Sequence, residues 1–89
     1  MSQQDKQREI ARLESDLNLY KRERDLLQQQ TENKRKELMD QMRSSTSTQR
    51  NVVIINQIGQ LNNEYGRKKT EIDAKIYQTR LIYFKKLSE

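Results

Sequence analysis

Ser44–Ser45–Thr46–Ser47–Thr48 is the stretch that decides the fold, because it interrupts two long, charged, proline-free segments of nearly equal length. Ser and Thr side chains hydrogen-bond to nearby backbone groups and so compete with helix, which makes this run the expected break in the chain. Each flanking segment repeats apolar residues at helical spacing. The sequence therefore predicts an all-α fold in which two long antiparallel helices form a coiled-coil hairpin.

The expected ends of the helices follow from capping chemistry. Ser2 is suited to cap the first helix, and Thr46 followed by Gln49 fits a capping box at the start of the second. The whole chain, 1–89, is then one coiled-coil module with a helix over about 3–43, a turn over about 44–48 and a helix over about 47–88. One continuous helix is the alternative, because the run contains neither Gly nor Pro and Ser and Thr cost only about 0.5 kcal/mol each in a helix.

The composition favours thin helices over a compact core. Hydrophobic residues make up 31% of the chain and charged residues 35%, whereas average proteins are roughly 45–50% apolar with Gly included. Disorder would bring Pro, Gly and little periodicity, but this chain has no Pro, two Gly and clear helical periodicity. Elongated helices with a narrow apolar seam, meaning the line of residues that faces the other helix, are the expected result.

The first helix carries a heptad pattern with a polar centre. Apolar residues alternate at steps of three and four at both ends of the helix, and the register passes through Arg24, Thr31 and Lys34 in the middle. The residues that we expect to form the hairpin seam on this helix are Ile10, Leu13, Leu17, Tyr20, Leu27 and Leu38.

The second helix begins with the densest apolar run, Val52 to Ile55. Its β-branched residues would suit a short strand, but later apolar residues continue from Ile54 at helical spacing, so we expect a helix. The register passes through Lys68, slips by four residues after Ile72 and continues to Tyr83 and Leu87. The residues that we expect to mediate self-association or partner binding are Ile54, Ile58, Leu61, Tyr65, Ile72 and Ile76.

Folding the chain at the turn predicts which residues face each other. With a fold at Ser45 or Thr46, paired residue numbers add to about 91, which places Arg24 opposite Lys68. The apolar start of the second helix would then meet the polar centre of the first, leaving Ile54, Ile58 and Leu61 half exposed. We therefore expect a second copy or another chain to complete a helical bundle, as a homodimer or a hetero-bundle. Arg24, Lys34 and Lys68 would set partner specificity.

The net charge of +5 supplies an alternative function. Three basic clusters, at 34–36, 67–69 and 85–86, could contact phosphate, and the first two would make the chain a basic helical dimer that binds nucleic acid. Acidic residues lie near each cluster, so a solvated, ion-paired helix surface is the favoured interpretation. The residues in question are Lys34, Arg35, Lys36, Arg67, Lys68 and Lys69.

The stretch from Tyr77 to Leu87 mixes apolar and basic residues. Its apolar residues wrap around much of the helix, so we expect the packed end of a bundle. Docking to a partner, or to an anionic membrane surface, is the alternative.

Nothing in the sequence indicates catalysis. The chain has no His, no Cys and no phosphate-binding Gly loop, and a thin bundle has no pocket in which carboxylates converge. We expect no enzyme activity, no cofactor, no metal and no small-molecule substrate. We also expect no membrane span, since no stretch approaches roughly 20 apolar residues. The polar segment from Met1 to Ile10 lacks a signal-peptide core, so the expected location is intracellular, in the cytoplasm with the nucleus as an alternative.

Taken together, these patterns favour a non-catalytic coiled-coil protein–protein interaction module that acts as a scaffold, adaptor or assembly subunit. A spacer within a longer coiled-coil protein is a further alternative.

Overall fold

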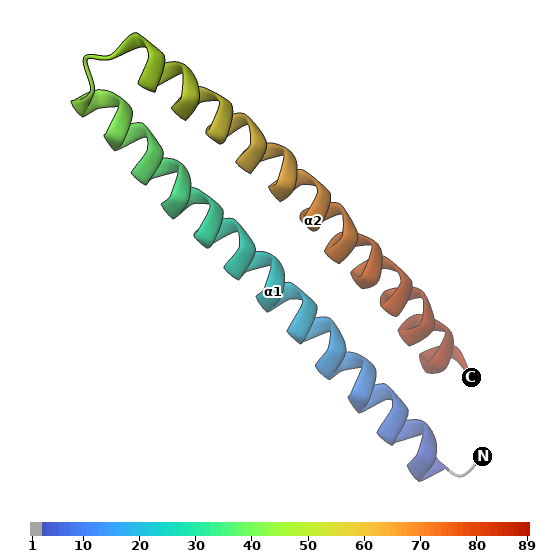
Figure 1. Ribbon diagram of the computed structural model, residues 1–89. Coiled ribbons are helices and arrows are strands. Elements are labelled where there is room, and N and C mark those ends of the chain that lie inside the picture. Colours follow the sequence, from blue (N-terminus) through green and yellow to red (C-terminus); the bar gives the residue numbers. More distant parts are fainter. Residues whose placement is uncertain (1–2) are drawn as a thin grey trace. The chain divides into compact units, whose positions relative to one another are not determined.

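The computed structural model describes residues 3–89 and consists of two helices, α1 (Gln3–Ser44) and α2 (Thr48–Ser88), joined by three non-helical residues. Figure 1 shows the chain passing along α1, through the turn and back along α2. The predicted hairpin is confirmed, and the continuous helix is not what the chain adopts. The predicted cap at Ser2 lies outside the described residues.

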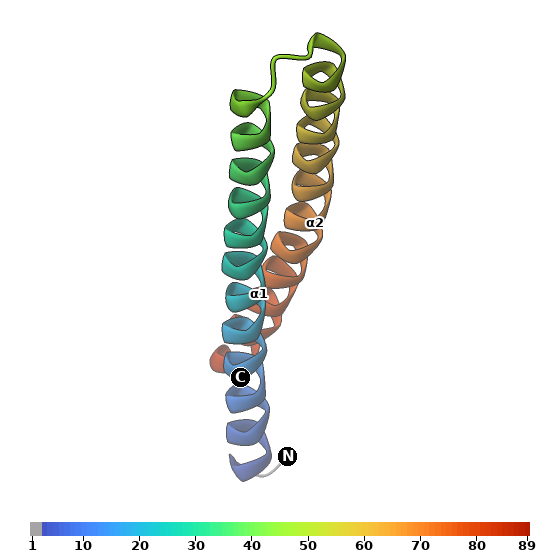
Figure 2. The same cartoon turned by 60° about the vertical axis from the view of Figure 1, so that its left-hand side comes forward.

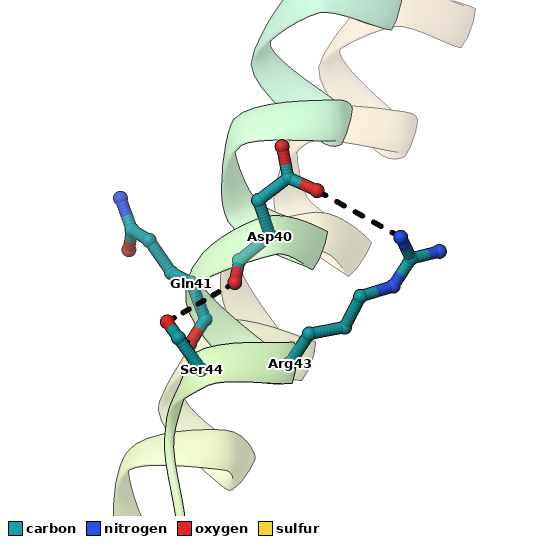
Figure 3. A network of polar contacts seen from close by, with 4 residues as sticks. All are labelled: Asp40, Gln41, Arg43 and Ser44. Atoms are coloured by element: carbon teal, nitrogen blue, oxygen red, sulfur yellow. Dashed lines mark hydrogen bonds and ion pairs between the residues drawn. The ribbon is translucent and has the colours of Figure 1, made fainter.

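The end of α1 is closed by a serine hydroxyl. Ser44 Oγ donates to the backbone oxygens of Asp40, at 3.2 Å, and Gln41, at 3.1 Å. Both carbonyls lie near the C-terminal end of α1, where the last four residues of a helix have carbonyl oxygens without intrahelical partners. Arg43 lies 3.9 Å from the Asp40 carboxylate, and its cation is favourably placed near the negative end of the helix dipole (Figure 3).

The cap of α2 is Ser47, so the predicted capping box at Thr46 is wrong. Ser47 Oγ accepts a hydrogen bond from the Arg50 N–H at 3.3 Å, and the Ser47 carbonyl accepts the first helical bond, from the Asn51 N–H at 3.1 Å. The cap is therefore one residue later than predicted, and Arg50 occupies the position where a capping box needs Glu or Gln. Ser47 caps the helix without the reciprocal half of the motif.

Contacts between the helices divide the chain into two compact units. The terminal unit comprises Met1–Arg24 and Thr70–Glu89, and the turn unit comprises Asp25–Lys69. In each unit a segment of α1 and a segment of α2 lie side by side in opposite directions (Figures 1 and 2). The buried side chains of the terminal unit are Leu13, Leu17 and Ile76, and those of the turn unit are Thr31, Leu38 and Ile54.

The pairing of residues across the helices differs from the prediction. In the terminal unit Glu9 pairs with Lys86 and Arg24 pairs with Asp73, so the paired numbers add to 95 and 97 instead of about 91. Helical side chains lean toward the N-terminus of their own helix. In an antiparallel pair those of α1 lean away from the turn and those of α2 lean toward it. Each α1 residue therefore meets a residue farther along α2 than counting from the turn suggests.

Candidate interaction surface

The inner side of a helix is the side that faces the other helix. In each unit it contains most of the residues that were predicted to form the hairpin seam. On α1, Leu13, Leu17 and Leu38 are buried, while Ile10, Tyr20 and Leu27 are half-buried. Thr31, predicted as part of the polar centre, is also buried, at 5% exposure. A shallow hollow of about 160 Å³ lies beside it, lined in part by Leu27, Leu61 and Tyr65.

The predicted association residues of α2 lie on this same inner side. Ile54 is the most buried large apolar residue of the described chain, at 2% exposure, and Ile76 is also buried. Ile58, Leu61, Tyr65 and Ile72 are half-buried. The expectation that Ile54 stays half exposed in a lone hairpin is wrong, because its side chain, like that of Leu38, is buried within the turn unit.

Each of the predicted specificity residues lies beside a carboxylate of the same unit. In the terminal unit Arg24 forms an ion pair with Asp73 at 3.3 Å, so the expected like-charge contact with Lys68 is absent. Lys34 is exposed and lies 3.6 Å from Glu37, one turn along α1. Lys68 is exposed and lies 3.4 Å from Glu64 on α2. Arg35, next to Lys34, takes the inward position in the register of the turn unit.

The basic clusters of the turn unit are engaged within the chain. Besides the Lys34–Glu37 and Lys68–Glu64 pairs, Arg35 donates from Nη2 and Nε to the side-chain oxygen of Asn62, at 2.7 and 3.2 Å. These contacts direct three of the six candidate phosphate ligands toward protein groups. Lys36, Arg67 and Lys69 are exposed on the same unit.

Polar pairs also hold the ends of the terminal unit together. Lys86 Nζ lies 2.8 Å from a Glu9 carboxylate oxygen, and the Tyr83 hydroxyl donates to Glu14 at 3.0 Å. The hydrogen bond and charge of Lys86 lower the pKa of Glu9, and the hydrogen bond to Glu9 raises the pKa of Lys86. The hydrogen bond to Glu14 raises the pKa of Tyr83. Lys86 thus takes the inward position that the sequence pattern assigned to Leu87, which is exposed.

The outer side of α2, away from α1, has a feature that the seam pattern alone does not reveal. Positions at helical spacing on this side are all exposed and carry no charged residue. In the turn unit these positions are Val52, Ile55, Gly59, Asn63 and Gly66. In the terminal unit they are Thr70, Ala74, Tyr77, Leu81, Phe84 and Ser88, which we call the terminal outer stripe.

The terminal outer stripe concentrates large apolar side chains in water. Tyr77 is 64% exposed, Leu81 53% and Phe84 58%. They follow one another at steps of four and three residues, so they lie on one face of α2. The hairpin alone leaves these three residues uncovered, and the packed bundle end expected from the sequence, which needs a further chain, stays a prediction. The sequence does contain a signal for the stripe: uncharged residues recur at steps of three and four along this side of α2, whether or not they are hydrophobic.

Two other kinds of feature, a metal site and a membrane span, were sought among the described residues. Among residues 3–89, no three His, Cys, Asp or Glu side chains are grouped as metal ligands would be. None of the helices described is both long enough and apolar enough to cross a membrane.

Comparison with known proteins gives no relative. The chain matches no protein-family model, no curated protein and no solved structure.

Proposed function

We propose that this chain is a non-catalytic helical module for protein–protein interaction, acting as a scaffold, adaptor or assembly subunit. The two inner sides hold the hairpin together, and the outer side of α2 contacts another chain. The observation that carries the proposal is the exposure of Tyr77, Leu81 and Phe84 on one face of the terminal unit. Single exposed apolar residues are ordinary on protein surfaces, but a contiguous group marks an interaction site.

Nucleic-acid binding by the basic clusters is the weaker candidate. Lys34, Arg35 and Lys68 already contact Glu37, Asn62 and Glu64, and phosphate would have to compete with these groups. Retention on duplex DNA that falls steeply with salt would support this alternative. The intracellular location expected from the sequence stays a prediction.

Site-specific photo-cross-linking in the cells that naturally produce the chain tests the proposal. A photoreactive amino acid replaces Tyr77 on the outer side of α2, and a matched variant carries it at Asn33, an exposed position on α1. We expect discrete adducts with protein from position 77 and few from position 33. Equal adducts from both positions, or none from either, would contradict the proposal.

A further inference from the structure

The terminal outer stripe has basic residues along both of its edges. At 3.6 residues per turn, Lys85 lies along one edge and Arg80 along the other, and both are exposed. The acidic residue nearest the stripe, Asp73, forms an ion pair with Arg24 of α1. The stripe is therefore an apolar line with one exposed cation beside each of its edges.

This pattern defines the chemistry of a complementary surface. In helix pairs, apolar residues form the contact line and the charges beside it select the partner and its orientation. A partner for this stripe needs apolar residues in the middle and carboxylates on both sides. We infer that the outer side of α2 in the terminal unit receives an acidic amphipathic α-helix from another protein. The inference rests on the proposed function and names the partner's chemistry.

A second copy of this chain fits the stripe poorly. If two copies pair antiparallel about Leu81, each Arg80 lies beside Arg80 of the other copy. If they pair in parallel, Arg80 of one copy lies beside Lys85 of the other. Both arrangements bring like charges together next to the apolar contact, which disfavours association.

A membrane surface also fits less well than a helix. Interfacial helices insert a broad apolar face, rich in bulky residues, into the lipid boundary. Here Tyr77, Leu81 and Phe84 form one line, with Thr70 and Ala74 before it and Ser88 after it. The other exposed large residues of this segment, Ile82 and Leu87, lie on either side of that line and not within it, while the opposite side of α2 packs on α1. A narrow line of this kind matches the contact seam of a helix pair.

Two designed peptides test the charge pattern on the full chain. Each has three heptads with Leu at the contact positions, and the flanking positions are all Glu in one peptide and all Lys in the other. We expect the Glu peptide to bind the hairpin at least about tenfold more tightly than the Lys peptide in fluorescence anisotropy. The double variant R80E/K85E should reverse this preference, which a general loss of folding cannot produce.

A matched pair of leucine substitutions tests where on the hairpin the Glu peptide binds. Leu81→Asp, on the terminal outer stripe, should weaken binding of the Glu peptide by at least about tenfold, since a charge would be buried in the contact. Leu19→Asp, at 52% exposure on the outer side of α1, should change it by less than about twofold. Circular dichroism of every variant should show the helix content of the parent chain.

Other outcomes overturn the inference in distinguishable ways. Equal binding of both peptides, or equal loss in both leucine variants, would refute the partner chemistry. If the chain alone sediments as a dimer that Leu81→Asp dissociates, the occupant is a second copy and the interaction function survives. If vesicles of phosphatidylserine and phosphatidylcholine bind the chain, and Leu81→Asp abolishes that binding, lipid is the occupant and the proposed function falls as well.

Discussion

α1 and α2 are nearly equal in length, at 42 and 41 residues, but they use their outer sides differently. The outer side of α1 comprises the exposed positions 8, 12, 15, 19, 22, 26, 30, 33, 37, 40 and 44. Five of these eleven residues are charged, namely Arg8, Arg12, Arg22, Glu37 and Asp40. The corresponding positions of α2 include no charged residue. α1 thus has one side suited to burial, whereas α2 has two, of which the hairpin covers only one. When a helix has more apolar surface than its fold buries, the uncovered part is a physical reason to look for a second contact.

The largest effect on stability should come from placing a charge on the inner side of α2, compared with placing the same charge on its outer side. Ile54→Asp buries an unpaired carboxylate in the turn unit, and we expect it to lower the free energy of unfolding by about 3 kcal/mol. Ile55→Asp, at a neighbouring position that is 55% exposed, should cost less than about 0.5 kcal/mol. Thermal unfolding followed by circular dichroism compares the two. Equal losses of stability in the two variants would mean that the inner and outer sides of α2 do not differ in burial.

Replacing the two glycines of α2 tests whether its outer side is uncovered in the hairpin. Gly59 and Gly66 lie inside α2 without positive φ, and an added Cβ would meet no atom within 4 Å at either position. Gly59→Ala and Gly66→Ala should therefore each stabilise the helix by about 1 kcal/mol. Ala74→Gly, on the same side, is the control and should destabilise by a similar amount. A loss of stability in either alanine variant would show that something in the hairpin already occupies that side.

The smallest effect should be the pH dependence of the Glu9–Lys86 pair on the inner side of the terminal unit. The lowered pKa of Glu9 means that its contribution is present above the usual value of 4.5 and disappears as pH falls through the lowered value. The raised pKa of Lys86 means that its contribution is present below 10.5 and disappears as pH rises through the raised value. Lys86→Gln should therefore slightly lower the unfolding midpoint at about pH 7, and this difference should shrink as pH falls below 4.5. A difference that does not shrink with falling pH would show that the pair is not the cause.

The sequence predicts the helices and the turn well because helical periodicity and serine chemistry are local. Residue-by-residue pairing was wrong, since it depends on the lean of side chains and on the offset between the helices, which no local pattern records. That error placed Arg24 opposite Lys68, although the structure pairs Arg24 with Asp73. The sequence pattern also left Ile54 half exposed, although the structure buries it. The terminal outer stripe was missed for another reason. The seam pattern assigns apolar residues to one side of a helix, and here a second side also lacks charge.

The position of the turn also determines the order in which contacts between the helices can form at the least cost in conformational entropy. The Arg35–Asn62 contact of the turn unit joins residues 27 apart, whereas the Glu14–Tyr83 contact of the terminal unit joins residues 69 apart. Each doubling of the enclosed chain adds about 0.6 kcal/mol to the entropic cost of closing a flexible loop. Once the turn unit has closed, the chain still free to move between the two arms is much shorter. The least costly route of closure therefore runs outward from the turn, and the segment that bears Tyr77, Leu81 and Phe84 is the last to be aligned along it.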